Sequence, residues 1–244
     1  MEQITDGVHR FDARGVNFYV IEGDDGLTVV DAGFSGHWRM FATWLFRTGS
    51  APREIQAVLL THNHPDHLGF VDRAQQQGAE VRIHADDLDG LARAGEAGLP
   101  DHFRRNAWRP RTAGRILSYA RAGATRTPVL TEVHPCTDGE RLKVPGNPRV
   151  VHVPGHTPGS AAYVFEDHDV ICVGDALATF DPATGRRGIS IPPAGLNDDD
   201  EQALASLDRL VDESVSLVLP GHGEPYHDGI GSAIHAARAI GAHW

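Results

Sequence analysis

The chain has 244 residues, of which 41% are hydrophobic, and its 33 acidic and 22 basic side chains give a net charge of −11. This length and composition predict a single α/β domain over residues 1–244 with a sizeable buried core. The negative charge disfavours nucleic acid as a partner, and without an apolar run of about 18 residues no transmembrane helix and no membrane partner are expected. Residues 1–7 lack the basic start and apolar stretch of a signal peptide, so we expect a cytoplasmic protein.

Strand-like and helix-like segments alternate through the first half of the chain. Two β-rich runs flank Gly23-Asp24-Asp25-Gly26 and predict a hairpin. A β-branched and leucine-rich strand then leads directly into a histidine-rich stretch. The predicted elements are strands at 16–22, 27–31, 55–60 and 81–84, and helices at 38–47 and 68–77.

The second half continues with shorter β-rich runs and ends in helical segments. Strands are expected at 129–133, 141–144, 149–153, 161–166, 170–174 and 216–219, and helices at 199–210 and 230–240. Strands with helices at both ends of the chain and in its middle predict two sheets sandwiched between helices.

Residues 61–67 read Thr-His-Asn-His-Pro-Asp-His and hold four side chains that bind metals, His62, His64, Asp66 and His67. Alternation in an extended segment would place His62, His64 and Asp66 on one side. One ion can hardly collect four ligands from so short a stretch, so the motif favours two neighbouring ions. Imidazole and carboxylate ligands suit zinc, with iron or manganese as alternatives, better than calcium or magnesium.

Three further ligand-type residues each follow a strand-like run and have glycine or proline beside them. They are His156 in Val-Pro-Gly-His-Thr-Pro-Gly, Asp175 in Cys-Val-Gly-Asp-Ala and His222 in Leu-Pro-Gly-His-Gly. Such turns leave a side chain facing an open cleft. Histidine is abundant, at 15 residues, so the interpretation depends on the order and context of the whole set.

The order His-x-His-x-Asp-His, Gly-His-Thr, Gly-Asp and Pro-Gly-His-Gly resembles the metallo-β-lactamase superfamily, and in particular its glyoxalase II-like and lactonase-like hydrolases. The resemblance implies the αββα fold, an α/β (α+β) sandwich of two mixed sheets flanked by helices. It also implies one metal on His62, His64 and His156, and a second on Asp66, His67 and His222. Asp175 would bridge the two ions, and Asp31 would orient a ligand loop.

This resemblance predicts a binuclear metal-dependent hydrolase in which a metal-bridged hydroxide attacks a small ester, lactone or thioester. Asp66 would be the catalytic side chain that orients the nucleophile or moves a proton. Only 22 residues follow His222, so the glutathione-binding helical region of true glyoxalase II enzymes is not expected. The expected partner is a small-molecule substrate, and the oligomeric state stays open.

Other functions remain as alternatives. A mononuclear iron centre on His62, His156 and Asp175 would indicate a persulfide dioxygenase-like oxidoreductase. Weak β-lactam cleavage and a non-catalytic metal-binding protein are further alternatives. Metal content and oxygen uptake distinguish the dioxygenase from the hydrolase.

Residues 86–126 form a predicted helical insertion within the domain. The segment concentrates arginine in an otherwise acidic chain. It is either a surface hairpin whose arginines pair with acidic side chains, or a wall over the metals that presents Phe103, Trp108 or Tyr119 to the substrate. The segments 34–41 and 178–193 are two further candidates for the edge of the cleft, the latter with an irregular composition.

The two cysteines, Cys136 and Cys172, are too few for a disulfide framework and are not in a Cys-x-x-Cys pair. Cys172, inside an apolar strand-like run, is expected to be a buried thiol. Cys172 lies three residues before Asp175, but the motif places Asp175 at the metal position.

Overall fold

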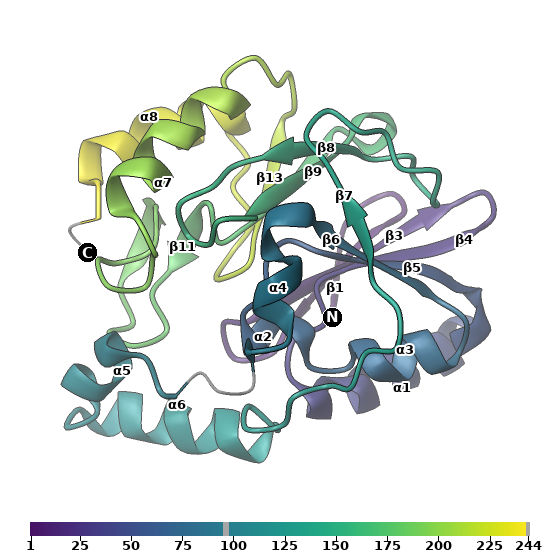
Figure 1. Cartoon of the computed structure of the whole chain (residues 1–244), viewed down its shortest axis with the longest axis horizontal. Helices are drawn as coiled ribbons and strands as arrows, with labels where there is room; N and C mark the ends of the chain where they lie inside the picture. The colour runs from purple at the N-terminus through teal and green to yellow at the C-terminus, as the bar shows by residue number, and fades with distance from the viewer. Residues whose placement is uncertain (95–97, 243–244) are drawn as a thin grey trace.

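One sheet contains the strands of the N-terminal half of the chain (Figure 1). The computed structural model describes residues 1–94 and 98–242, and within them this sheet has seven strands in the order β1 to β7. The strands are β1 (Glu2–Thr5), β2 (Val8–Asp12), β3 (Asn17–Gly23), β4 (Gly26–Val30), β5 (Ile55–Leu60), β6 (Glu80–His84) and β7 (His134–Cys136).

The first sheet changes from antiparallel to parallel pairing at β4. Strands β1 to β4 pair antiparallel, whereas β4, β5, β6 and β7 run parallel. Parallel strands end at the same edge of a sheet, and ligands typically bind beyond that edge. The residues that follow β4, β5 and β6, among them Asp31, His62 and Asp87, therefore gather in one region.

The second sheet has the order β13–β10–β9–β8 within the described residues. Its strands are β8 (Arg149–His152), β9 (Ala161–Phe165), β10 (Val170–Gly174) and β13 (Leu217–Pro220). Strands β10 and β13 are parallel, so Asp175 and His222, which come after them, also lie at one edge. A separate hairpin pairs β11 (Ala178–Phe180) with β12 (Arg187–Ser190).

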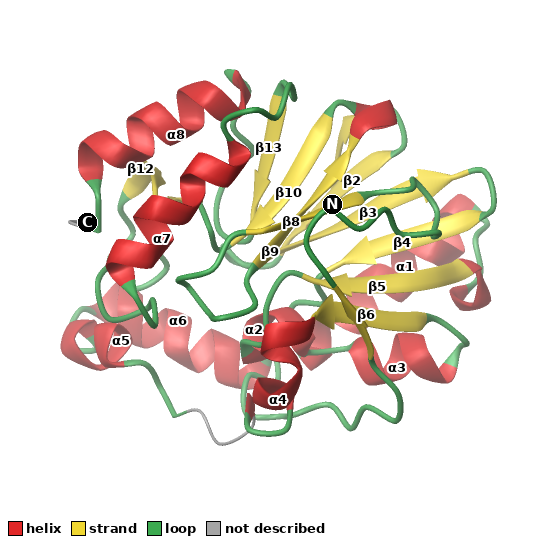
Figure 2. Ribbon diagram, turned by 45° about the horizontal axis from the view of Figure 1, so that its top comes forward, coloured by secondary structure: helices red, strands yellow, loops and turns green. Residues whose placement is uncertain are grey.

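Helices cover the outer faces of both sheets, as Figure 2 shows. The α-helices are α1 (Trp38–Thr48), α2 (Pro65–Leu68), α3 (Val71–Gln76), α4 (Leu88–Leu91), α5 (Asp101–Asn106), α6 (Pro110–Arg121), α7 (Asp200–Ser206) and α8 (Gly229–Ile240). Short 3₁₀ turns are η1 (Ser35–His37), η2 (Pro52–Glu54), η3 (Ala85–Asp87), η5 (Glu166–His168) and η6 (Leu207–Leu210). Across residues 1–94 and 98–242, no helix combines the length and apolarity that crossing a membrane requires.

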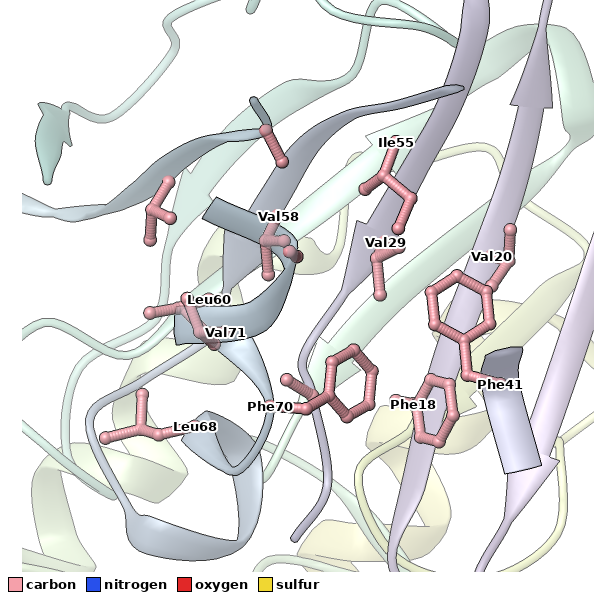
Figure 3. Packing of buried hydrophobic residues seen from close by; sticks show 14 of the residues in the cluster. Phe18, Val20, Val29, Phe41, Ile55, Val58, Leu60, Leu68, Phe70 and Val71 are labelled. Atoms are coloured by element: carbon pink, nitrogen blue, oxygen red, sulfur yellow. The ribbon is translucent and has the colours of Figure 1, made fainter. Parts of the chain in front are cut away.

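Alternating side chains on the strands build three layers of core. In β5, Val58 and Leu60 pack beneath α1 and α3, whereas Ala57 and Leu59 point into the layer between the sheets. Figure 3 shows the first of these layers, where Phe18 and Phe41 lie against strands and helix α1. A third layer joins the second sheet to α7 and α8. This arrangement is the predicted αββα sandwich.

Several predicted elements have different bounds in the structure. Residues 129–133 are loop, and the strand follows at β7. Residues 141–144 contribute a single bridge, between Arg141 and Arg149, instead of a strand. The segment 178–193 contains the β11–β12 hairpin. Strands β1 and β2 were not predicted.

The predicted helix at 68–77 starts earlier and is broken. Helix α2 already begins at Pro65, and α3 resumes at Val71. Between them Gly69 lies so close to the backbone of Phe34 that a Cβ atom would collide with it, and its N–H donates to Gly33 O at 2.7 Å. The break therefore results from the close contact between this turn and the chain after β4.

The predicted helical insertion contains α4, α5 and α6, while its residues 95–97 lie outside the described part of the chain. Both cysteines are buried between the two sheets, which was expected for Cys172.

Candidate metal centre

The histidine-rich motif follows β5 and changes conformation in its middle. His64 is extended, with ψ 147°, and Pro65 then occupies the first position of α2. Proline is favoured at that position because its fixed φ suits the first helical turn. The prediction of an extended segment through Asp66 is therefore wrong: Asp66 and His67 lie on a helical turn, and the turn brings His67 back toward the sheet.

The structure brings all seven predicted ligand residues together from four segments of the chain. Their potential ligand atoms form overlapping groups in which the atoms lie within 4.8 Å of one another. These groups are His62, His64 and His156; Asp66, His67 and His222; and His62, His67 and Asp175. The first two match the division that the family resemblance implies, and the metal roles themselves stay a prediction.

Asp175 lies between the two histidine groups. Its Oδ2 atom is 3.4 Å from His156 Nε2 and 3.2 Å from His222 Nε2, and its Oδ1 atom is 3.6 Å from His67 Nε2. Nδ1 of His64 lies 2.9 Å from Nε2 of His156. One carboxylate therefore contacts both groups, as a bridging ligand would.

Four of the histidines use their outer ring nitrogen to bind the surrounding protein. Nδ1 of His67 lies 2.8 Å from Asp31 Oδ2, and Nδ1 of His222 lies 2.7 Å from Gly15 O. The other two contacts are His156 Nδ1 to Asn197 Oδ1 at 3.1 Å and His62 Nδ1 to Thr61 Oγ1 at 3.0 Å. Such contacts fix the ring orientation and leave Nε2 toward the centre.

Asp31 connects the end of β4 to the motif after β5. Its carboxylate accepts hydrogen bonds from the N–H of Thr61 at 2.9 Å and from its hydroxyl, in addition to the contact with His67. Asp31 adopts a left-handed backbone conformation, with φ 62°. That conformation is costly for a residue with a Cβ and often occurs at functional sites.

Asp87 is a supporting residue that the sequence interpretation missed. Its fully buried carboxylate accepts from the N–H of Asn63 at 3.0 Å, the hydroxyl of Thr157 at 2.8 Å and the N–H of Gly159 at 2.7 Å. Asn63 lies between the first two motif histidines, and Thr157 follows His156. One carboxylate thus holds two ligand loops together. Its position in the turn that follows β6, at the same sheet edge as Asp31, could have identified it from the sequence.

Three buried polar atoms at the centre have no hydrogen-bond partner among the described residues: His62 Nε2, His67 Nε2 and Asp175 Oδ1. Buried polar groups are normally paired, so such atoms require an explanation. All three point into the overlap of the ligand groups. Imidazole nitrogen and carboxylate oxygen are the donors that zinc and iron accept, so these residues fit metal ions.

Burial and charge act in opposite directions on these groups. Burial lowers the pKa of His156 to about 4 and holds that of His62 well below its usual value. Burial would also lower the pKa of His67, but the neighbouring carboxylates of Asp31, Asp175 and Asp66 raise it to about 10. The carboxylates therefore favour positive charge at this position, whether a proton or a cation supplies it.

The centre opens to solvent on the side of Asp66. The Asp66 side chain is 27% exposed, compared with 7% for Asp175 and 0% for His67. Asp66 Oδ2 also lies 3.4 Å from His222 Nε2. A substrate entering the centre would therefore meet Asp66 before it meets Asp175.

Helix α6 of the insertion forms a wall beside this opening. Thr112 donates to Ala183 O at 2.6 Å, Arg115 to Pro182 O, and Tyr119 to Arg14 O at 3.0 Å. Spacings of three and four residues place these side chains on one side of the helix. We define the α6 wall as these three residues. Tyr119 takes part in this wall, whereas Trp108 is 76% exposed and lies beneath Arg109, and the contact of either residue with substrate stays a prediction.

The alternative interpretation, in which the insertion arginines pair with acidic side chains, applies to two of them. Arg104 pairs with Asp101, and Arg126 with Asp72 at 2.8 Å. In the segment 34–41, Phe41 is fully buried in the core, and Phe34 lies 4.9 Å from Tyr119, measured between ring centroids.

A further histidine pair, His84 and His152, lies near Asp86 outside the centre. The two rings are stacked, 3.9 Å apart and 10° from parallel, so their in-plane lone pairs do not converge. His152 Nε2 lies 2.8 Å from Pro158 O, which makes it a donor, and His84 Nδ1 accepts from the N–H of Asp86. This pair is therefore engaged within the protein and is a poor site for a cation.

Comparison with known proteins agrees with the fold and the histidine order. The probable metallo-hydrolase YqgX of Bacillus subtilis (strain 168) is 28% identical over 210 residues, covering 85% of this chain and 84% of that protein. The hydroxyacylglutathione hydrolase of Shewanella pealeana is 25% identical over 175 residues, covering 71% of this chain but 46% of that enzyme.

A solved structure, TTHA1623 in a di-iron-bound form, superimposes with a TM-score of 0.63 at 25% identity. The superposition covers 95% of this chain and 97% of that protein. The metallo-beta-lactamase superfamily itself matches residues 11–222, a span that contains Asp31 and all seven ligand candidates. The chain therefore belongs to the metallo-beta-lactamase superfamily and is a metal-dependent hydrolase.

Proposed function

We propose that the chain hydrolyses a small ester, lactone or thioester at a centre that holds two divalent metal ions. The observation that carries this proposal is the pair of ligand groups that share Asp175. His62, His64 and His156 would hold one ion, and Asp66, His67 and His222 the other, with Asp175 between them. When bound, such ions act as Lewis acids and lower the pKa of water to near neutrality.

Zinc is the proposed metal, with iron or manganese as alternatives. Five imidazoles and two carboxylates suit all three ions. The di-iron form of the similar structure TTHA1623 supports iron as an alternative and also supports the number of two. Asp31, Gly15 and Asn197 would keep the histidine rings in place, so the geometry is set before a metal binds.

Asp66 is the proposed catalytic side chain. Asp66 is more exposed than Asp175, the other carboxylate among the seven ligand candidates. It lies at the opening, where it contacts solvent and His222. From this position its carboxylate can orient a water molecule and take up a proton from it. The buried Asp175 cannot exchange protons with solvent as readily, because three histidines surround its carboxylate.

The proposed substrate class follows from the centre and from the relatives. The hydroxyacylglutathione hydrolase relative acts on a glutathione thioester by its name, which supports a thioester among the candidates. The dioxygenase alternative needs one iron on His62, His156 and Asp175. That arrangement would leave His67 Nε2 without a partner, although the atom is buried and points into the centre.

Metal analysis combined with hydrolysis assays tests this proposal. The purified chain is analysed for zinc, iron and manganese and assayed with a thioester, a lactone, a neutral ester and a β-lactam. We expect about two metal ions per chain, hydrolysis of at least one of the first three substrates, and loss of activity on chelation. A single iron with oxygen uptake and no hydrolysis would overturn the proposal.

A further inference from the structure

Two arginines lie over one aromatic ring at the edge of the metal centre. The guanidinium carbon of Arg115 is 4.8 Å from the ring centroid of Phe180, and that of Arg187 is 5.4 Å from the same ring. Phe180 and Arg187 are directly opposite each other in the β11–β12 hairpin. Arg115 comes from the α6 wall. Two separate elements therefore place a guanidinium group against the same ring.

Phe180 is directly connected to the loops that hold His222. Its ring packs so closely on Gly15 that a Cβ atom there would lie 2.7 Å from it. The carbonyl of Gly15 is the partner of His222 Nδ1, at 2.7 Å. The residue before Phe180, Thr179, donates its N–H to the carbonyl of His222 at 3.0 Å. The arginine pair thus lies next to the support of one ligand histidine.

Neither guanidinium is neutralised by a carboxylate. Among the ion pairs of residues 1–94 and 98–242, none includes Arg115 or Arg187. The nearby carboxylate of Asp181 is fully buried and is bound by His102 at 3.0 Å, by the N–H of Ala183 at 2.8 Å and by Thr184. The two positive charges are therefore available to a ligand.

This local charge contrasts with the charge of the whole chain, which is −11. An anionic small molecule would be repelled by the protein as a whole, and it would also meet the carboxylate of Asp66 at the opening. A pair of arginines near that opening makes the local potential more positive, which favours anions there. The planar guanidinium forms paired hydrogen bonds with a carboxylate.

We propose that Arg115 and Arg187 bind a carboxylate group of the substrate while its scissile ester, lactone or thioester bond lies at the metal centre. This inference rests on the proposed hydrolase function and narrows it to acidic substrates. The insertion then contributes one arginine of the pair and the hairpin contributes the other. Phe180 contacts both guanidinium groups through its ring.

Matched esters and matched arginine variants test the proposal. The substrates are 4-nitrophenyl hexanoate, which is neutral, and the mono-4-nitrophenyl ester of adipic acid, whose carboxylate is too far along the chain to form an anhydride readily with its own ester. The variants are Arg115→Gln and Arg187→Gln, with Arg111→Gln and Arg121→Gln, two exposed arginines of α6, as controls. The controls change the net charge equally, so they separate a local site from a general electrostatic effect.

We expect the wild-type chain to prefer the acidic ester in kcat/KM. Each of Arg115→Gln and Arg187→Gln should reduce that preference by about tenfold, as expected for losing a hydrogen bond to a charged group, and leave the neutral ester and the metal content nearly unchanged. The controls should leave the ratio unchanged. Because Arg115 also donates to Pro182 O, the exposed Arg187 keeps the test valid if the Arg115 variant folds poorly.

The two proposals fail in different ways. If the metal-loaded chain hydrolyses neither these esters nor a lactone or thioester, the hydrolase function fails, and the anion site with it. If it hydrolyses both esters with the same kcat/KM, and the Arg115 and Arg187 variants leave the ratio unchanged, the hydrolase function stands and the anion site is overturned. An equal effect of the control variants would likewise overturn a local site.

Discussion

The metal centre and the α6 wall are neighbours, but different interactions hold them. Five of the seven ligand residues are buried, and the centre is built from turns that directly follow strands of two sheets. The wall is a helix whose other side faces solvent, and three side chains attach it to backbone carbonyls. The centre is therefore part of the sandwich, whereas the wall is attached to its surface.

This difference assigns hydrolytic chemistry to the metal centre and substrate choice to the α6 wall. Hydrolytic chemistry requires ligands that stay in one geometry, and strand ends tied by buried hydrogen bonds provide this rigidity. Substrate choice requires side chains that can vary without affecting the core, and a surface segment provides that freedom. Changes in the centre should therefore remove metal and activity together, whereas changes in the wall should alter selectivity alone.

The largest effect is expected for Asp175→Ala, which removes the carboxylate shared by both ligand groups. Metal content should fall, and kcat/KM should fall on the order of a thousandfold, since a bound metal contributes several kcal/mol to transition-state stabilisation. Metal analysis and the ester assay measure this. Asp212→Ala, an exposed aspartate far along the chain, is the control. Full metal loading with unchanged activity would exclude the bridging role.

A smaller effect on the same side of the comparison is expected for Asp87→Ala. Removing the buried carboxylate leaves the N–H groups of Asn63 and Gly159 unpaired, so the free energy of unfolding should fall by about 3 kcal/mol. Metal affinity should fall about 10- to 100-fold, as for other residues that orient ligands. Denaturant unfolding and metal titration measure the two effects.

Two controls accompany the Asp87 variant. Asp87→Asn keeps one carbonyl acceptor and should recover part of both losses. Asp89→Asn, at an exposed position two residues along, should behave like the wild type. If Asp87→Ala loses stability but binds metal as tightly as the wild type, the residue supports the fold and not the ligand loops.

Replacing α5 and α6, residues 101–121, by a flexible glycine–serine linker tests the wall. We expect metal content to stay near the wild-type value, while the preference between acidic and neutral esters changes by about tenfold. The replacement must leave η3 intact, because Asp87 lies there and supports the centre. Loss of metal from a folded replacement would mean that the wall also holds the centre together.

The smallest effect is expected when the folded chain is treated with an alkylating reagent that attacks the thiols between the two sheets. Burial raises the pKa of Cys136 to about 11 and that of Cys172 well above its usual value. Only the thiolate reacts readily, so neither cysteine should be alkylated at pH 8 in the folded chain, and both should react in denaturant. Mass spectrometry after alkylation measures this. Rapid labelling of the folded chain would show that the layer between the sheets opens.

Elements with a strong local pattern could be predicted from the sequence. Strands β5 and β10 have the predicted bounds because they are apolar and buried throughout, apart from the exposed Gln56 in β5. The seven ligand candidates were identified because imidazole and carboxylate side chains next to glycine and proline are unusual after such strands. The family resemblance then added the division into two metal groups.

Two β-rich runs, 129–133 and 141–144, were predicted to be strands but are not, because their backbone groups have other hydrogen-bond partners. In 129–133, the side chain of Gln75 accepts from the N–H of Thr131, so this backbone is paired with a side chain instead of a neighbouring strand. In 141–144, Leu142 and Val144 do enter the core, but the backbone forms a turn in which the N–H of Leu142 donates to Pro148 O. β-propensity describes how a side chain fits a half-buried surface and does not select the hydrogen-bond partner.

Residue chemistry, short-range periodicity and the family resemblance were thus enough to predict the layered fold and the seven ligand candidates that the structure brings together. The tertiary structure decided that Asp87 supports two ligand loops, that Asp66 and His67 lie on a helical turn, and that Arg115 and Arg187 meet over Phe180. These contacts join residues that are distant in the chain. They depend on which strands end at the same edge and which surfaces pack, and neither is encoded in a local pattern of residues.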